Sequence, residues 1–296
     1  MNKPPSTIAQ VSDTAFLAAA YRAKETERTD ALFRDPLAAV LAGERGRRII
    51  DALPPKAFIG GWTVVIRTRV IDAMILEAIA SGVDTVLNLG AGLDARPYRM
   101  DLPASLRWIE ADQAHVIDYK ENLLANETPH CRLERVRLDL ANHDVRRTFL
   151  ASTAISASNI LVLTEAVTPY LTEASVAALA ADLRAHPSFR CWINDYFSPS
   201  SYEYRRRSGM TSALKNAPFL FEPQDYFGFF RQNGWVPQHE RYLAEEAETF
   251  RRPAPFPLPM RLLMMIGGLF ASPEQRRATK RYTGYIQFAP TKSGNT

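Results

Sequence analysis

The chain is poor in the residue types that bind metals or form disulfide frameworks. Its 296 residues contain two cysteines, Cys131 and Cys191, and five histidines. The cysteines have no metal-ligand spacing, and each begins an apolar run that is typical of a strand. We therefore predict two small buried thiols and no metal site, with a disulfide as the less favoured alternative in a chain that looks intracellular.

The sequence also lacks a long hydrophobic run. Its longest apolar stretch, LLMMIGGLFA at 262–271, is about half of the ~20 residues that a membrane span requires. The apolar run AFLAAA near the N-terminus is short and follows Asp13, unlike a signal peptide. We predict a soluble, cytoplasmic protein with no membrane partner, in which 262–271 forms either a flexible apolar lid or a core helix.

Charge of one sign is in small excess. Lys and Arg number 36 against 32 Asp and Glu, which gives a formal net charge of +4. This balance permits a nucleic-acid partner without arguing for one, and we expect none. With 46% hydrophobic and 23% charged residues, the composition is that of a globular chain rather than a disordered one.

Helical patterns dominate the first part of the chain. The sequence predicts helices over 12–25, from Asp35-Pro36 onward, and over 61–82. Apolar, β-branched runs follow, at intervals that leave room for helices between them. The predicted strands are 83–89, 107–111, 132–138, 159–163 and 189–194, with a closing strand at 282–289. Strands that alternate with helices indicate an α/β, doubly wound and mostly parallel sheet.

We expect a single domain over the whole chain. The stretch before the closing strand is rich in aromatics, arginine and proline, and we interpret it as a cap over the sheet. The four predicted segments are N-terminal helices at 12–82, a cofactor-binding core at 83–196, a cap or substrate segment at 197–283, and a closing strand at 284–290 of the domain 1–296.

A glycine pair follows the first predicted strand. Gly90 and Gly92, followed by Ala95, formally match the dinucleotide fingerprint. Glycine permits positive φ angles and close approach of a ligand to the backbone. The next strand ends in WIEADQ, which places Glu110 and Asp112 20 and 22 residues after Gly90. An acid at this spacing can accept hydrogen bonds from ribose hydroxyls, so loop and acid together favour an adenosine-type ligand over a bare turn.

Two features argue against a nicotinamide dinucleotide. The loop follows three predicted helices, whereas the fingerprint usually opens its domain. Arg96, Pro97 and Arg99 also give a longer turn than one that leads directly into a pyrophosphate-binding helix. No Tyr-x-x-x-Lys pair or other hydride-transfer site is evident. S-Adenosylmethionine, which has no phosphates, needs a ribose acid, an adenine slot and a partner for its carboxylate.

Arg67 is the best candidate for that partner. It lies on the apolar stripe of the long predicted helix. A charge on such a face needs a buried anion or a route to solvent, and a structural salt bridge is an equal alternative. Arg22, on an alanine-rich helix face, is a weaker candidate for the same role. Arg69 is expected to pair with Asp72 on its own helix instead.

Two further acids follow predicted strands. Asp139 comes just after the third strand, where it or the Leu140 backbone can meet an adenine amino group. Glu165 comes just after the fourth strand, at the edge where the chemistry of such a sheet belongs. A single acid at a strand end is often only a helix cap, but acids at the ends of three successive strands favour a site.

In combination, these motifs resemble a known family. The ordered set YRAKETERTDALFRDPLAAVLAG, RTRVID, VLNLGAGLDARPYR, WIEADQAHVIDYK, VRLDL and LTEAVTPYLT is similar to the leucine carboxyl methyltransferase family. More narrowly, it resembles the bacterial branch with polyketide-biosynthesis O-methyltransferases of the tetracenomycin type. The resemblance covers roughly residues 10 to 200. It implies a class I methyltransferase (Rossmann-like) fold with a seven-stranded sheet and S-adenosyl-L-methionine as cofactor.

The resemblance also implies roles for individual residues. One departure is Asn88, two residues before the first glycine, where many class I methyltransferases carry an acid. Asn88 brings no charge, which leaves the cofactor ammonium to backbone carbonyls and Glu165. The implied cofactor contacts are Arg67 at the carboxylate, Gly90 and Gly92 along the cofactor, Asp112 at the ribose, Asp139 and Leu140 near the adenine, and Glu165 near the methionyl end.

The acceptor is less well determined. Methyl transfer from a sulfonium is an in-line displacement, for which the protein mainly supplies proximity, alignment and electrostatics. A carboxylate acceptor needs no general base, whereas a phenol benefits from one. No histidine falls at an evident strand-end position, which mildly favours a carboxylate, and we assign no catalytic base. Tyr170, Tyr196 and Tyr202 are the expected substrate contacts.

We therefore predict an S-adenosylmethionine-dependent O-methyltransferase, acting as a monomer or homodimer. Its expected acceptor is a small-molecule carboxylate or phenol, polyketide-like or of another secondary metabolite. The alternatives are a protein C-terminal carboxyl methyltransferase, a nucleic-acid methyltransferase and a non-catalytic S-adenosylmethionine-binding protein. Base methylation is disfavoured because EAVTPY after the fourth strand lacks the Asn/Asp-Pro-Pro-aromatic block.

Overall fold

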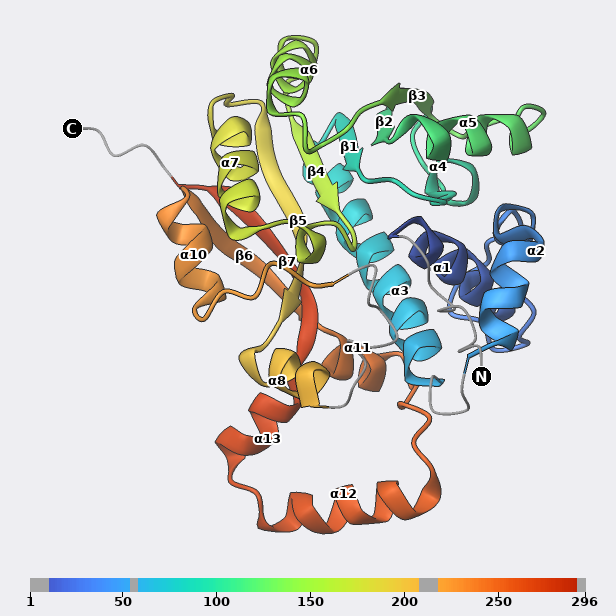
Figure 1. Ribbon diagram of the computed structural model, residues 1–296, viewed down its shortest axis with the longest axis vertical. Helices are drawn as coiled ribbons and strands as arrows, with labels where there is room; N and C mark the ends of the chain where they lie inside the picture. Colours follow the sequence, from blue (N-terminus) through green and yellow to red (C-terminus); the bar gives the residue numbers. More distant parts are fainter. Residues whose placement is uncertain (1–10, 54–57, 208–217, 292–296) are drawn as a thin grey trace, which may run out of the picture.

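The computed structural model describes residues 11–53, 58–207 and 218–291. Figure 1 shows these residues arranged around one sheet, whose strand order is β3-β2-β1-β4-β5-β7-β6. The sheet is parallel from β3 to β5, and β7 is antiparallel to both of its neighbours. The predicted α/β, class I methyltransferase fold with a mostly parallel, seven-stranded sheet is confirmed. The strands are β1 Thr85–Leu89, β2 Arg107–Asp112, β3 Arg132–Arg137, β4 Ile160–Thr164, β5 Phe189–Phe197, β6 Trp235–Tyr242 and β7 Thr283–Pro290.

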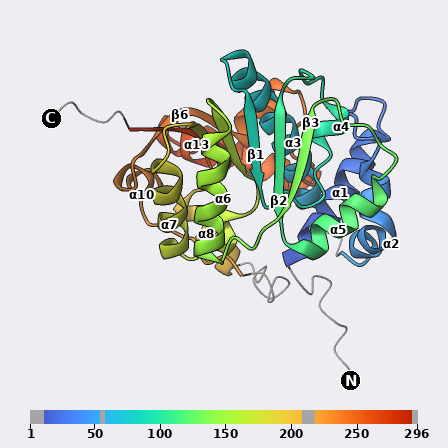
Figure 2. The ribbon, with the colours of Figure 1, turned by 90° about the horizontal axis from the view of Figure 1, so that it is seen from above.

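Helices cover both faces of this sheet (Figures 1 and 2). One face packs against α3 and α11, and the other against α7 and α10. The strands β1 (TVLNL) and β4 (ILVLT) are buried at every position, as expected for parallel strands between two helical layers. The longer helices are α1 Val11–Thr26, α2 Ala38–Asp51, α3 Phe58–Ala80, α5 Ala114–Leu123, α6 His143–Ile155, α7 Glu173–Arg184 and α12 Leu258–Phe270. The shorter ones are α4 Arg96–Arg99, η2 Thr168–Tyr170, α8 Pro199–Arg207, α10 Tyr226–Gln232, α11 Leu243–Thr249 and α13 Pro273–Lys280.

The predicted elements agree with the structure to within three residues at their ends. Each strand expected from an apolar run is present, and α1 and α3 match the first and third predicted helices. Helix α7 begins as its sequence suggests, because the Thr172 side chain accepts a hydrogen bond from Ser175 N at 3.2 Å. Helix α2 differs, since it begins at Ala38 and Pro36 lies in the preceding turn.

The segment predicted as a cap contains a strand of the sheet. Residues 208–217 within it lie outside the described residues. Strand β6 (WVPQHERY) forms the sheet edge beside β7, with a register irregularity next to Pro237. An edge strand tolerates proline because one side of its backbone needs no partner strand. The segment 197–283 therefore contains part of the sheet as well as the helices α8, α10, α11, α12 and α13.

The apolar stretch at 262–271 is neither a buried core helix nor a membrane span. Most of it belongs to α12, in which no residue is buried. Among the described residues, no helix is long and apolar enough to cross a membrane. Cys131 and Cys191 are free and buried, as predicted, and burial raises their thiol pKa values to about 11 and about 12. The described ranges also hold no cluster of side chains suited to a metal ion.

Candidate active site at the strand ends

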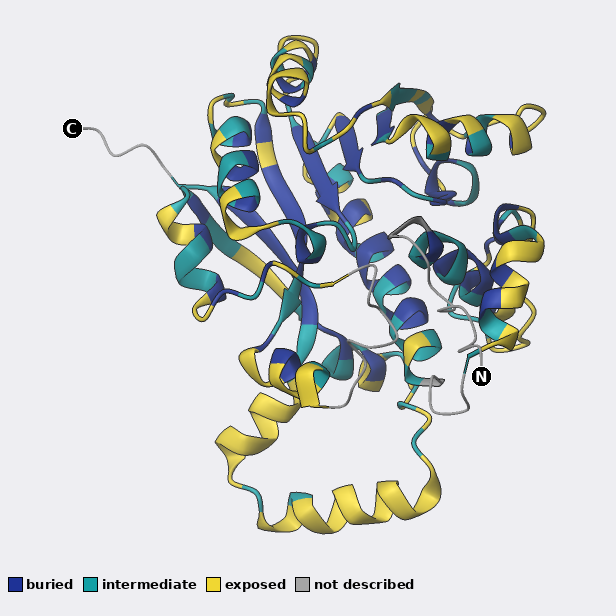
Figure 3. Cartoon of the chain, viewed as in Figure 1, coloured by how far each residue is buried: buried dark blue, intermediate teal, exposed yellow. Residues whose placement is uncertain are grey.

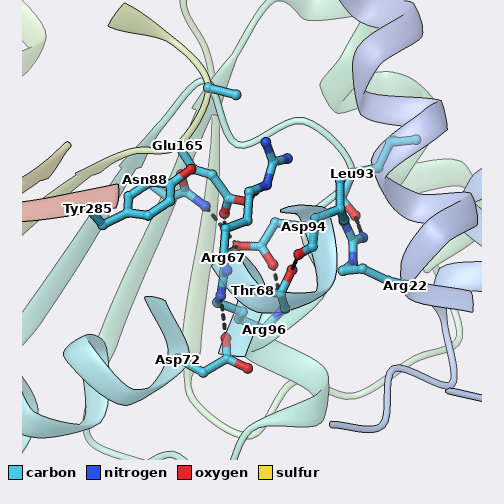
Figure 4. A network of polar contacts seen from close by, with 12 residues as sticks. Arg22, Arg67, Thr68, Asp72, Asn88, Leu93, Asp94, Arg96, Glu165 and Tyr285 are labelled. Atoms are coloured by element: carbon cyan, nitrogen blue, oxygen red, sulfur yellow. Dashed lines mark hydrogen bonds and ion pairs between the residues drawn. The ribbon is translucent and has the colours of Figure 1, made fainter. Parts of the chain in front are cut away.

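The carboxyl ends of β1, β2 and β4 bring three turns together at one edge of the sheet. In doubly wound sheets this edge is where ligands bind. Figure 4 shows the polar residues that meet there. We call five of them, from α3, the glycine loop, α4 and the turn after β4, the strand-end network. Its members are Arg67, Asp72, Asp94, Arg96 and Glu165.

The glycine loop passes through a space that only glycine fits. Gly90 has φ +69°, and a Cβ built there would lie 2.4 Å from Val167 Cγ2 in the turn after β4. Gly92 has φ +49°, and its Cβ would lie 3.3 Å from the Cβ of Ala15 on α1. Positive φ is costly for other residues. The loop backbone is thus held between the β4 turn and α1.

Asp112 fixes this loop from the end of β2. Its Oδ2 accepts a hydrogen bond from Gly92 N at 2.7 Å, and its Oδ1 accepts one from Gln113 N at 2.7 Å. A carboxylate has about four acceptor positions, so it can still accept hydrogen bonds from a ligand. Glu110 is fully buried instead and pairs with Lys120 at 2.7 Å and Arg135 at 2.9 Å. Of the two acids in WIEADQ, Asp112 is therefore the one at the loop.

Arg67 reaches the same edge from the middle of α3. Its Nε lies 2.9 Å from Glu165 Oε1, which is an ion-pair distance. The angle makes no hydrogen bond, however, so this buried N–H has no hydrogen-bond partner among the described residues. Burial raises the pKa of the Glu165 carboxyl, but Arg96 and Arg67 outweigh it and hold this pKa below its ordinary value. The salt bridge considered from sequence exists, and it joins two residues that were both predicted for the site.

Arg96 is the centre of the network. The sequence alone did not identify this residue as part of the site. Its side chain is 2% exposed. It contacts Asp72 at 2.7 Å, Asp94 at 2.9 Å and Glu165 at 2.8 Å. Three carboxylates around one guanidinium satisfy charges that would be costly to bury alone. The available signal was its place in the turn after the glycines, beside the first-strand edge.

The expected pair of Arg69 with Asp72 does not form. Asp72 pairs instead with Arg96 and with Arg99. The NH2 group of Arg99 lies 2.8 Å from Asp72 Oδ1. The Arg69 guanidinium lies over the Phe250 ring instead, 5.5 Å from its centroid. Helical spacing alone favoured the local pair. Two arginines from the turn after β1 make a better-buried set of contacts with the same carboxylate.

Asn88, at the position where an acid was expected, contacts a carboxylate of the glycine loop. Its Nδ2 donates a hydrogen bond to Asp94 Oδ2 at 3.0 Å, and both residues are buried. Burial raises the pKa of Asp94, but Arg96, Lys120 and Arg22 hold it well below the ordinary range. The charge missing at position 88 is thus present six residues later, as a carboxylate that Asn88 helps to position.

Asp195, at the end of β5, is a second residue that the sequence did not reveal. It accepts a hydrogen bond from Tyr285 Oη on β7 at 2.8 Å and one from Ala166 N at 2.8 Å. Ala166 has φ +55°, a strained value for alanine. Burial raises the Asp195 pKa to about 6, against the opposing effects of Tyr285 and Arg67. Asp195 therefore holds the turn that carries Glu165.

The remaining cofactor candidates have different surroundings. Arg22 is buried, with Nε 2.8 Å from Asp35 Oδ2 and a hydrogen bond from NH2 to Leu93 O at 2.5 Å. Asp139 is exposed and accepts a hydrogen bond from Ala141 N at 3.0 Å, in the turn after β3. Leu140 is half-buried beside the core. The structure thus brings Arg22 to the glycine loop but leaves Asp139 apart from the network.

Aromatic ring contacts link two of the three tyrosines predicted as substrate contacts. Tyr170 contacts Phe219 with ring centroids 5.4 Å apart, Phe219 contacts Phe197 at 5.2 Å, and Phe197 contacts Tyr202 at 5.9 Å. Tyr170 is half-buried, and Arg67 is near enough to act on its pKa, which burial raises. Tyr196 lies next to Asp195 in β5 but stacks on Phe227, with ring centroids 5.5 Å apart, among aromatics of α10 and β6. Tyr202 is 3% exposed on α8. Tyr170 is the one of the three whose pKa Arg67 of the network affects.

Known proteins are similar in sequence to this chain over most of its length. Residues 15–184 match the family model described as Leucine carboxyl methyltransferase. A Streptomyces avermitilis protein, named as a candidate S-adenosyl-L-methionine-dependent methyltransferase, is 32% identical over 260 residues, covering 82% of this chain and 89% of that protein. A Frankia alni protein with the same kind of name is 30% identical over 254 residues, covering 81% and 87%.

Solved structures show a more distant likeness. A methyltransferase candidate from Thermobifida fusca has a TM-score of 0.48 at 13% identity and covers 94% of each chain. Magnesium protoporphyrin IX methyltransferase from Synechocystis with bound SAH has a TM-score of 0.46 at 11% identity, covering 83% of this chain and 93% of that one. The family match, by contrast, spans more than half of the sequence and includes the whole strand-end network. The chain belongs to the leucine carboxyl methyltransferase family.

Proposed function

We propose that this protein is an S-adenosyl-L-methionine-dependent methyltransferase that methylates an oxygen atom of a small molecule. The observation that carries the proposal is the glycine loop hydrogen-bonded to Asp112, 2.7 Å from Gly92 N, beside the Arg67–Glu165 pair. The family match and the candidate methyltransferases of Streptomyces avermitilis and Frankia alni support the cofactor and the reaction type.

The residues at the strand ends fit this cofactor. Arg67 has a buried N–H without a hydrogen-bond partner among the described residues, as a site for an external carboxylate requires. Asp112 retains acceptor positions for the ribose hydroxyls. Gly90 and Gly92 give the loop the positive φ angles and the close packing against Val167 and Ala15 that place its backbone at the strand ends. Glu165 supplies the negative charge for the ammonium group that Asn88 cannot supply.

Other predicted contacts take more limited roles in the proposal. Arg22 holds the carbonyl of Leu93 and so positions the glycine loop rather than the cofactor carboxylate. Asp139 and Leu140 remain the candidates for the adenine end, because they follow β3 on the Asp112 side of the sheet. Tyr170 is the proposed substrate contact nearest to Arg67.

The reaction requires little covalent chemistry from the residues of the chain. When bound, the cofactor would supply a methyl group activated on a sulfonium: the acceptor oxygen bonds to the methyl carbon in line as the carbon–sulfur bond breaks, and S-adenosylhomocysteine is the leaving group. The chain's residues orient the two partners and exclude water. Arg96 keeps Glu165 ionised and in place, at 2.8 Å, so the negative charge stays at the strand ends.

A carboxylate is the acceptor that these residues favour. It is already a nucleophile at neutral pH, so the site needs no general base. The five histidines, on α5, before β3, on α6, after α7 and on β6, are all outside the strand-end network. A phenol remains the alternative because Asp195, with a pKa of about 6, is an acid whose ionised form could accept a proton.

The acceptor class can be tested with cofactor that carries a labelled methyl group. The purified chain is incubated with extracts that contain acidic and phenolic metabolites, and the labelled products are then treated with mild alkali. A methyl ester releases labelled methanol under these conditions, whereas an aryl methyl ether does not. We expect release of the label. Alkali-stable product would replace the carboxylate by a phenol, and label in protein or nucleic acid alone would overturn the small-molecule proposal.

A further inference from the structure

A helical hairpin stands clear of the rest of the molecule. It joins α11 to β7 and consists of α12, Leu258–Phe270, and α13, Pro273–Lys280. We call residues 258–280 the arm. Figure 1 shows α12 at the periphery, beyond α8 and α13, and Figure 3 shows it exposed along its length. Neither helix contains a buried residue.

The exposed surface of α12 is apolar on all sides. Its sequence, LPMRLLMMIGGLF, contains one charged residue, Arg261. Six large side chains are each between 51% and 86% exposed, namely Leu258, Leu263, Met265, Ile266, Leu269 and Phe270. A helix that is hydrophobic all round is normally buried. A contiguous exposed apolar surface of this kind usually marks a contact with another molecule.

The composition of α12 favours a protein surface over a lipid one. A helix that lies on a membrane needs a polar face rich in Lys or Arg, and α12 has a single arginine. Gly267 and Gly268 add a second reason. Glycine weakens a helix relative to alanine, yet a Cβ at either position would meet no atom of the described residues within 4 Å. Such residues allow the backbone of another helix to approach closely.

The base of the arm is fixed to its own subunit. Lys280 Nζ lies 2.8 Å from Glu248 Oε2 on α11, and Arg281 NH1 lies 3.5 Å from Glu240 Oε2 on β6. Closure of α12 onto its own strand ends, as a lid would require, has to move this anchored base. A partner that comes to the arm needs no such change.

We propose that the arm is a dimerisation element, with α12 packing against α12 of a second copy of this chain. Aromatic side chains bury about 150–250 Å² each; with roughly the same scale for Leu, Ile and Met, the six residues, each 51–86% exposed, provide on the order of 800 Å² per copy. Two copies then bury about 1,600 Å², the size of a standard stable interface. In an antiparallel two-fold arrangement, Arg261 of each copy lies near the negative C-terminal end of the other α12.

The oligomeric state of the full chain tests this proposal. Sedimentation velocity at ~20 μM should give twice the mass of the 33.2 kDa chain. The double variant Leu263→Glu/Ile266→Glu, which places like charges on one helix face, should be monomeric and should raise the dimer Kd at least 100-fold. The matched control is Ile155→Glu, because Ile155 is 87% exposed on α6, away from the arm. It should remain dimeric.

Cysteine cross-linking locates the contact. Both native cysteines are buried, with raised pKa values, so Leu263→Cys adds the only exposed thiol. Oxidation should give covalent dimers of this variant and none of Ile155→Cys. A monomeric wild type, or a dimer unaffected by the double variant, overturns the proposal. Flotation of the wild type, but not of the double variant, with phosphatidylcholine–phosphatidylglycerol vesicles would overturn it in favour of a membrane.

Discussion

The strand-end network and the arm differ in how their unfavourable groups are satisfied. The network contains five charged side chains, three buried and two half-buried, and each has an opposite charge within 2.9 Å. The arm exposes large apolar side chains of α12, and nothing in the described part of the chain covers them. Buried charges are tolerable once paired, whereas an exposed apolar helix is tolerable once another molecule covers it. The charges of the network are therefore satisfied largely within the chain, whereas the apolar surface of the arm is not covered by the described part of the chain.

The largest expected effect separates the two regions by stability. Arg96→Met leaves Asp72, Asp94 and Glu165 buried without their shared partner, so the free energy of unfolding should fall by about 3–5 kcal/mol. Denaturant unfolding measures this loss. In the arm, Leu263→Ala should change it by less than about 0.5 kcal/mol at protein concentrations low enough to keep the arms apart. Equal losses at both sites would remove the contrast.

The pH dependence of stability should also distinguish the regions. The folded pKa of Asp195, about 6, lies above its ordinary value of 3.8. As pH rises from about 4 to 6 the unfolded chain loses this proton first, so ionisation in the fold costs up to about 3 kcal/mol, and none of this cost applies below both pKa values. Unfolding of wild type and Asp195→Asn, measured from pH 4 to 7, should therefore shift in favour of the variant as pH rises. Leu263→Ala should show no such trend, and a flat difference for Asp195→Asn would contradict the assignment.

Cofactor affinity should depend on Asp112 and not on the arm. Asp112→Ala removes a charged acceptor for the ribose hydroxyls, which should weaken S-adenosylmethionine binding about 10- to 100-fold without unfolding the protein. Calorimetric titration measures the change. The control is Asp118→Ala, since Asp118 is an exposed acid that pairs with Arg137 on β3. Unchanged affinity in the Asp112 variant would remove this residue from the site.

The smallest expected effect concerns Arg67. Arg67→Met keeps the unbranched apolar part of the side chain and should weaken cofactor binding by about 10-fold, through loss of one charge-assisted contact. Arg69→Met is the matched control on the same helix, because its guanidinium lies over Phe250 rather than in the network. A folded Arg67→Met variant with unchanged affinity would mean that the salt bridge to Glu165 is purely structural.

Features that depend on neighbouring residues were predicted from the sequence better than contacts between distant segments. The strand ends, the glycine loop and Asp112 follow from short patterns, because hydrophobic runs and glycines act locally. The Arg96 contacts could not be predicted, since Asp72 and Glu165 lie 24 and 69 residues away in sequence. Strand β6 was not predicted, because its central residues are polar and include Pro237, as edge strands allow.

The arm shows most clearly what the hydrophobic pattern of a sequence does not predict. The run at 262–271 was expected to be either a lid or a core helix, because an apolar segment normally packs within its own chain. In the structure it lies at the periphery, and the ion pairs of Lys280 and Arg281 join the nearby end of the arm to α11 and β6. Periodicity identifies an apolar helix but does not tell what covers it.

The most direct test of the central claim is calorimetric titration of the full chain with S-adenosylmethionine, its demethylated product S-adenosylhomocysteine, and NAD. The glycine loop, Asp112 and the incompletely bonded Arg67 predict micromolar or tighter binding of both sulfur-containing ligands and no binding of NAD. If folded protein binds neither sulfur-containing ligand at micromolar concentrations, or binds NAD instead, the strand ends are not the methyl-donor site described here.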